Sequence, residues 1–270
     1  MSARRATGLL VVTAFVSLAW VAAAYAQATT KPFEPTVGQA GKDVVWVPTP
    51  QALVEKMLDL AKVTPQDFVM DLGSGDGRTV ITAAKRGARA QGVEYNPDMV
   101  ELSKRNAQQA GVTDKATFVK ADLFETDFSK AQVITMFLLP SINMRLRPQI
   151  LKMKPGTRVV SNTFTMEDWQ PDQTETIGGD CTSWCTANLW IVPAQVQGTW
   201  QSGQNALTLK QTFQNVEGTL GSTPISAGKL RGDEITFSVG NTKYTGKVNG
   251  NMISGTMSGG SSGSWTATKK

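Results

Sequence analysis

The stretch FVMDLGSGDGR, from Phe68 to Arg78, decides the fold of this chain. Its first residues form a short apolar run that is typical of a buried strand. Three glycines then alternate with polar residues: Gly73, Ser74, Gly75, Asp76 and Gly77. A helical pattern follows from Thr79. A strand, a glycine-rich turn and a helix in succession predict the ligand-binding corner of a doubly wound α/β sheet, where a tight turn lets a ligand approach the backbone.

Charge and spacing in this turn indicate the kind of ligand. A dinucleotide-binding fingerprint places its third glycine one residue later, at the position of Arg78. The carboxylates of Asp71 and Asp76 would repel a pyrophosphate, but they suit a ligand that carries an ammonium and a sulfonium group. These features favour S-adenosylmethionine as the cofactor. The alternative is a structural turn in a Rossmann-like domain that binds no ligand.

Two further signals flank this corner. An acidic residue is expected at the end of the second strand, about 20 residues beyond the turn, where it can bind ribose hydroxyls. Glu94, in QGVEYNPDMV, fits this position, and Asn96 and Pro97 then predict the start of a helix. Before the corner, Thr49 and Pro50 predict the N-cap and first residue of another helix.

The sequence resembles the class I S-adenosylmethionine-dependent methyltransferases. More narrowly, it is similar to bacterial homologues of the mitochondrial lysine methyltransferases that act on the ATP synthase c-subunit and the adenine nucleotide translocase. The resemblance covers about residues 43 to 193, in WVPTP (46–50), DLGSGDGR (71–78), GVEYNP (92–97), DLFE (122–125), FLLP (137–140) and GTRVVSNTF (156–164). The cofactor motifs are specific to the superfamily, whereas WVPTP and FLLP favour the narrower branch.

This resemblance implies an α/β fold with a Rossmann-like seven-stranded sheet and a defined set of site residues. The cofactor-binding residues would be Asp71, Gly73, Ser74, Gly75, Asp76, Gly77, Glu94, Asn96, Asp122 and Leu123. Asp122 would meet the adenine amino group and Leu123 would cover the ring, although Asp122 could instead cap a turn. The residues on the substrate side would be Trp46, Pro48, Leu139 and Pro140. For Trp46, a role as a packing residue alone is an equal alternative.

The implied reaction is methyl transfer to an amine acceptor, which would be a protein lysine, including one on a membrane protein, or a small molecule. No catalytic base is assigned, because the cofactor carries the reactivity and the protein mainly positions the reactants. The alternative is an exported, non-catalytic binding or scaffold module. The sequence has no histidine, which excludes a Ser-His triad and a His-ligated metal, and we expect no metal site. A net charge of +5 is too weak and scattered to argue for a nucleic-acid partner.

Residues 1–26 have the features of a secretory signal peptide, with two arginines before an apolar run. Ala24-Tyr25-Ala26 is a small-x-small cleavage site. We therefore expect export to the periplasm, and the alternative is an inner-membrane anchor formed by the same segment. Residues 27–42 would then form a linker and residues 43–194 the methyltransferase domain.

Cys181 and Cys185 are the only cysteines and lie in the loop of an expected hairpin. In an exported protein, two cysteines this close are expected to form a disulfide rather than a redox or metal site. Residues 195–270 are rich in Gly, Ser and Thr and predict short alternating strands. Repeated glycine-flanked segments, with Trp200 and Trp265 near the two ends, predict a small antiparallel barrel or sandwich that acts as a stabilising or docking module.

Overall fold

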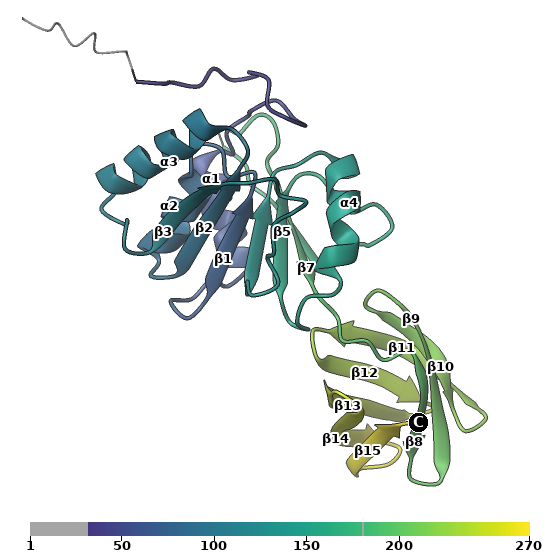
Figure 1. The fold of residues 1–270 in the computed structure, drawn as a ribbon. Coiled ribbons are helices and arrows are strands. Elements are labelled where there is room, and N and C mark those ends of the chain that lie inside the picture. The colour runs from purple at the N-terminus through teal and green to yellow at the C-terminus, as the bar shows by residue number, and fades with distance from the viewer. Residues whose placement is uncertain (1–31, 180) are drawn as a thin grey trace, which may run out of the picture. The chain divides into compact units, whose positions relative to one another are not determined.

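The computed structural model describes residues 32–179 and 181–270. The expected signal peptide and the first part of the expected linker lie outside the described residues. Within them, a mixed sheet flanked by helices is followed along the chain by an antiparallel barrel (Figure 1). No helix in this part of the chain has the length and apolar character needed to cross a membrane.

The mixed sheet has seven strands in the order β3-β2-β1-β4-β5-β7-β6. They are β1 (Phe68–Leu72), β2 (Arg89–Glu94), β3 (Ala116–Lys120), β4 (Val133–Met136), β5 (Arg158–Asn162), β6 (Gln173–Thr176) and β7 (Thr186–Ile191). The first five strands are parallel, and β7 runs antiparallel to both β5 and β6. The strand order reverses between β1 and β4, and open α/β sheets bind ligands beyond the carboxyl ends of the strands at such a switch point.

Four helices cover the sheet: α1 (Gln51–Leu60), α2 (Arg78–Lys85), α3 (Pro97–Gln109) and α4 (Pro140–Ile150). Side chains of β1 alternate between two cores, because successive residues of a strand point to opposite faces. Val69 belongs to the core with α1, α2 and α3, whereas Met70 and Leu72 belong to the core with α4. Every residue of β4 is buried, as expected for a central parallel strand covered on both faces. The predicted seven-stranded Rossmann-like sheet is confirmed.

The last eight strands close into a barrel, which decides between the two predicted all-β arrangements. They are β8 (Gly198–Ser202), β9 (Asn205–Thr212), β10 (Asn215–Leu220), β11 (Thr223–Arg231), β12 (Glu234–Val239), β13 (Thr242–Asn249), β14 (Met252–Gly259) and β15 (Gly263–Lys269). Closure occurs because β8 pairs with both β9 and β15. Large side chains fill the interior, among them Trp200, Phe237 and Trp265. An interior of this size holds side chains and leaves little space for a ligand.

The repeated glycines lie where barrel strands approach closely. Gly246 and Gly255 are direct partners across the β13–β14 hairpin, and Gly228 pairs with Val216 across the β10–β11 hairpin. A Cβ atom on Gly255 would lie 1.9 Å from the carbonyl oxygen of Thr245, which no side chain tolerates. The sequence repeat therefore reflects two similar hairpins in a closed barrel and carries no chemistry of its own.

Candidate functional site

A cavity of about 420 Å³ opens beyond the carboxyl ends of β1, β2 and β4, at the switch point of the sheet. This volume lies within the range of about 300–1,000 Å³ that is common for small-molecule sites. The structure brings together in its lining twelve of the predicted site residues: Trp46, Pro48, Asp71, Gly73, Ser74, Gly75, Asp76, Glu94, Asn96, Asp122, Leu123 and Leu139. Residues as far apart in the sequence as Trp46 and Leu139 thus line one cavity.

Two predicted site residues, Gly77 and Pro140, do not line the cavity. Gly77 is the N-cap of α2 with φ of 83°, and a Cβ atom there would lie 2.8 Å from the ring of Phe118. Pro140 is the first residue of α4, where its missing N–H leaves no bond unmade. Their positions in the motifs reflect the helices that begin there, so they shape the border of the cavity instead of its surface.

The glycine-rich turn is held to the end of β2 by backbone hydrogen bonds. The amides of Gly73 and Ser74 donate to the carbonyl oxygen of Val93, at 2.9 and 3.0 Å. Glu94 then accepts from the amide of Gly75 at 3.0 Å through one carboxylate oxygen and from the amide of Asn96 at 2.9 Å through the other. Glu94 therefore fixes the turn as well as presenting its carboxylate to the cavity.

Asp71 ends up buried beside this turn without a compensating cation. The residue is 6% exposed, and its carboxylate accepts a hydrogen bond of 2.7 Å from the hydroxyl of Thr135 and another from the hydroxyl of Thr79. Burial, together with the nearby carboxylates of Asp76 and Glu94, raises the pKa of Asp71 to about 7. No lysine or arginine of the described residues forms an ion pair with it. The site therefore favours a ligand that brings a positive charge.

Asp76, by contrast, is already neutralised. Arg78 donates to both of its carboxylate oxygens, from Nε at 3.0 Å and from a terminal nitrogen at 2.5 Å. The other terminal nitrogen of Arg78 donates to the carbonyl oxygen of Thr49 at 2.8 Å. One arginine thus ties the glycine-rich turn to the segment that precedes α1.

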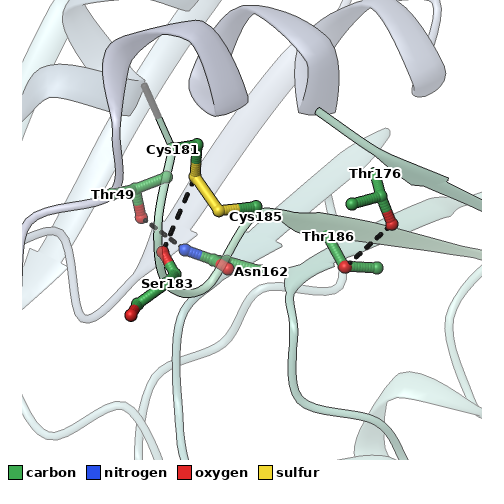
Figure 2. The surroundings of a disulfide bond; sticks show 7 residues. All are labelled: Thr49, Asn162, Thr176, Cys181, Ser183, Cys185 and Thr186. Carbon is green, nitrogen blue, oxygen red and sulfur yellow. Dashed lines mark hydrogen bonds between the residues drawn. A yellow bond between two sulfur atoms is a disulfide. The ribbon is translucent and has the colours of Figure 1, made fainter. Parts of the chain in front are cut away.

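The prediction that Thr49 caps α1 is wrong. The N-cap is Pro50, and it makes no side-chain capping bond. The Thr49 hydroxyl instead accepts a hydrogen bond of 3.2 Å from the buried amide of Asn162, at the end of β5 (Figure 2). A buried amide left without a partner costs free energy, so the hydroxyl is used there.

A short strap before α1 contributes a residue that the sequence did not indicate. The backbone folds back on itself, with the amide of Gly38 donating to the carbonyl of Trp46 at 2.8 Å. Lys42, within this strap, forms an ion pair with Asp122 and lies 4.6 Å from the centre of the Tyr95 ring. Its hydrogen bond holds the pKa of Asp122 below the ordinary value. Lys42 belongs to the segment predicted as a linker, and no motif marks it.

Asp122 caps a turn, as the alternative interpretation of the sequence expected, and it also lines the cavity. One carboxylate oxygen accepts from the amide of Phe124 at 2.9 Å, which caps the turn after β3. The other is paired with Lys42, and the side chain also lines the cavity. Leu123 lines the same end. The cofactor-side residues are therefore a mixture of turn-forming and cavity-facing groups.

The opposite end of the cavity is apolar and aromatic. Phe137, Leu139, Phe164 and Trp184 line it, and the rings of Phe137 and Phe164 stack with their centres 5.9 Å apart. Phe137 and Phe164 lie in the FLLP and GTRVVSNTF segments but carried no predicted role. Trp184 lies in the loop closed by a disulfide between Cys181 and Cys185. Only its position between two cysteines could have drawn attention to it.

In the described part of the chain, no three His, Cys, Asp or Glu side chains are grouped to hold a metal ion.

The chain is similar to known methyltransferases. The model of the family described as the ANTKMT methyltransferase domain matches residues 71–173. A protein-lysine N-methyltransferase of Saccharolobus islandicus is 47% identical over 48% of this chain and 83% of its own length. The mouse lysine N-methyltransferase of the ATP synthase c-subunit is 35% identical over 50% of this chain, and the mouse adenine nucleotide translocase lysine N-methyltransferase is 38% identical over 44%. The chain spans about half the length of these two mouse relatives, 55% and 52%.

A solved structure that is similar to this chain is also a methyltransferase. It is described as an RNA methyltransferase from Salinibacter ruber in complex with S-adenosyl-L-homocysteine. It is 47% identical, covers 56% of this chain and 96% of its own, and superposes with a TM-score of 0.52.

Replacing Asp71 with Asn is expected to stabilise the cofactor-free protein at pH 8 and to weaken its binding of S-adenosylhomocysteine. The folded-state pKa of about 7 lies above the ordinary value of 3.8. Between these pH values the folded protein keeps a proton that the unfolded chain has lost, so stability falls as pH rises through this window. Over the whole window the free energy of unfolding falls by roughly 4 kcal/mol. Denaturant unfolding from pH 4 to 8, with calorimetric titration at pH 8, measures both effects.

Asp114→Asn provides the control, because it removes the same charge from an exposed residue outside the cavity. It should leave the slope of stability against pH and the binding of S-adenosylhomocysteine unchanged. Equal slopes for the wild type and Asp71→Asn between pH 4 and 7 would contradict the assignment of this titration to Asp71.

Glu94→Gln should weaken binding of S-adenosylhomocysteine by at least about tenfold (~1.4 kcal/mol), whereas Asp122→Asn should weaken it by less than about threefold. Both oxygens of Glu94 accept from backbone amides, and an amide NH₂ group cannot accept in place of either. Asn at position 122 still offers an oxygen to Phe124, and the ion pair that it loses is partly exposed, which limits its contribution. Isothermal titration calorimetry compares the two variants, and a reversed order would contradict this account of the turn.

Proposed function

The chain belongs to the S-adenosylmethionine-dependent methyltransferases of the ANTKMT family, and we propose that it transfers a methyl group to the ε-amino group of a lysine in a protein. The observation that carries the proposal is the two-ended cavity. Carboxylates and an open glycine-rich backbone line one end, and aromatic and aliphatic side chains line the other. A cationic cofactor suits the first end, and the alkyl chain of an amine acceptor suits the second.

The residues at the first end fit S-adenosylmethionine. Asp71 supplies a carboxylate without an ion-pair partner among the described residues, which suits the ammonium of the cofactor. Glu94 would hold the ribose hydroxyls, and Leu123 would cover the adenine ring. When bound, the cofactor supplies an electrophilic methyl group on a sulfonium. The chain's own residues bind and orient the reactants, and orientation of this kind lowers the barrier substantially.

The residues at the second end favour the neutral form of the acceptor. A lysine amine must lose its proton before it can attack, and its unperturbed pKa is about 10.4. Phe137, Leu139 and Phe164 have apolar side chains that cannot solvate an ammonium group. Burial of an amine against such side chains lowers its pKa. This lining supplies deprotonation through desolvation, so the proposal assigns no catalytic base.

Protein lysine is the acceptor named for the relatives from Saccharolobus islandicus and mouse. The Salinibacter protein is instead described as acting on RNA. The charges around the cavity favour the protein acceptor, because its two basic lining residues, Lys42 and Arg78, are both paired with carboxylates. They are not available as a basic surface for phosphates, which supply much of the affinity of RNA-binding proteins.

The non-catalytic alternative is not favoured, and the exported location stays a prediction. A scaffold module has no need for a buried carboxylate such as Asp71, which lowers the stability of the fold. The disulfide between Cys181 and Cys185 supports an oxidising compartment, since such bonds persist mainly outside the cytosol. The features that predict export lie in residues 1–26, outside the described residues.

Incubation with methyl-labelled S-adenosylmethionine should place label on lysine. The purified protein is mixed with soluble proteins, membrane proteins or total RNA from a strain that lacks this chain, and mass spectrometry locates the methyl group. We expect methyl-lysine in one of the protein fractions. Asp71→Asn serves as the inactive control, and Asp114→Asn should match the wild type. Label in RNA alone, or in no fraction, would refute a protein-lysine acceptor.

A further inference from the structure

We propose that Trp184 is a positioning residue for the acceptor and that the disulfide between Cys181 and Cys185 holds it in place. This inference rests on the proposed methyl transfer and adds the group that receives the acceptor's ammonium at the aromatic end of the cavity. The family model matches residues 71–173, so this loop lies beyond the matched region. It is a feature of this chain that the family match does not account for.

Three rings form a continuous surface at the acceptor end, which we call the aromatic wall: Phe137, Phe164 and Trp184. The centre of the Phe137 ring lies 5.9 Å from that of Phe164, in a stacked arrangement, and 6.0 Å from that of Trp184, edge to face at 61°. All three rings line the cavity. Trp184 therefore extends a group of rings that begins with residues just after β4 and β5.

Backbone hydrogen bonds anchor one side of the loop to the sheet. The amide of Thr163 donates to the carbonyl oxygen of Thr186 at 2.6 Å, and the amide of Ile177 donates to that of Cys185 at 2.9 Å. These bonds set the residues just before β7 beside the residues that follow β5. Trp184 is thereby brought to the level of Phe164, across the β5–β7 pair.

The disulfide anchors the other side. Cys181 and Cys185 lie four residues apart, with their Cα atoms 5.9 Å apart, so the bond closes a small loop around Trp184. Figure 2 shows this bond with its surroundings, which include the hydrogen bond between Thr49 and Asn162. Cys185 is fixed by the sheet, and the disulfide passes that restraint to Cys181.

The conformation of Trp184 is one that needs such restraint. Its φ of 54° is in the left-handed region, which bulky residues rarely adopt and which persists where the surrounding structure enforces it. The side chain is also 43% exposed, so burial in a core does not explain its position. A strained, exposed tryptophan on a cavity wall is better explained by contact with a bound group.

The group that this wall fits is an alkylammonium. The faces of aromatic rings attract cations, and tryptophan does so most strongly among the side chains. A lysine reaches the site charged, and a lysine that has already gained one or two methyl groups also carries a positive charge at neutral pH. The wall would guide this group toward the cofactor end. In the transfer itself, the amine lone pair forms the new N–C bond, the sulfur keeps the electrons of the broken S–C bond, and the amine has given up its proton to water.

Tetramethylammonium chloride tests binding without relying on catalysis. It is titrated into protein saturated with S-adenosylhomocysteine while the indole N–H resonance of Trp184, assigned with Trp184→Phe, is followed by NMR. We expect a saturable shift in the wild type. Replacing both cysteines, as Cys181→Ser with Cys185→Ser, should weaken the titration about two- to fivefold, in line with the strength of an exposed cation–π contact. Ser183→Ala, in the same loop, is the matched control and should titrate like the wild type.

Methyl transfer to poly-L-lysine supplies the second measurement. Trp184→Ala and the double cysteine variant should raise KM for this acceptor about two- to fivefold and leave kcat and binding of S-adenosylhomocysteine unchanged, whereas Trp184→Phe should retain most of the acceptor affinity. Unaltered binding of S-adenosylhomocysteine shows that each variant is folded.

The two proposals fail in different ways. If tetramethylammonium leaves the Trp184 resonance unmoved, or if the variants transfer methyl groups with an unchanged KM, Trp184 has no positioning role and the proposed methyl transfer is unaffected. If the wild type methylates neither poly-L-lysine nor any protein fraction, the proposed lysine acceptor is wrong. In that case the tetramethylammonium titration still decides whether the aromatic wall binds a cation.

Discussion

The buried carboxylate of Asp71 is the constraint on which the rest of the site depends. It lies at the carboxyl end of β1, where the hydroxyls of Thr135 and Thr79 donate to it and no cation of the described residues is paired with it. Such a group destabilises the folded protein whenever it is ionised, and its raised pKa expresses that cost. A bound positive charge would relieve it. Folding and cofactor binding are therefore coupled through a single side chain, because the same ionisation that weakens the empty fold strengthens the complex.

Asp71 differs from the other carboxylates of the site in its partners. Arg78 neutralises Asp76, Lys42 neutralises Asp122, and two backbone amides satisfy Glu94. Among the described residues, Asp71 and Glu94 therefore have no ion-pair partner beside the open glycine-rich turn, and of these two only Asp71 is buried. A pyrophosphate would meet repulsion from these carboxylates, even though the N-terminus of α2 lies at the same turn. The distinction between two ligand classes on one fold thus follows from which carboxylates have partners.

The sequence predicted the cofactor end well because its chemistry is local. Strand, turn and helix follow each other within about twenty residues, and Glu94 comes at the end of the next strand. At the acceptor end, which is assembled across the sheet, it did not indicate Phe137, Phe164 or Trp184. Thr49 was assigned as a cap because its partner, Asn162, is 113 residues away. Gly77 and Pro140 belong to recognisable motifs but start helices. The alternating pattern of residues 195–270 predicted β structure, but this pattern is the same in a sandwich and in a barrel. Only the pairing of β8 with β15 in the structure shows that the strands close into a barrel.

The two ends of the cavity therefore differ in how many amino-acid substitutions they can tolerate. The cofactor end is built from contiguous, mutually bonded backbone, where a substitution alters the turn as well as the ligand contact. The aromatic end draws Phe137, Phe164 and Trp184 from separate segments, and each follows or lies between strands instead of forming their cores. Loops at the carboxyl ends of strands tolerate change because the sheet, not the loop, carries the stability. A disulfide restores to one such loop the rigidity that the proposed positioning role requires.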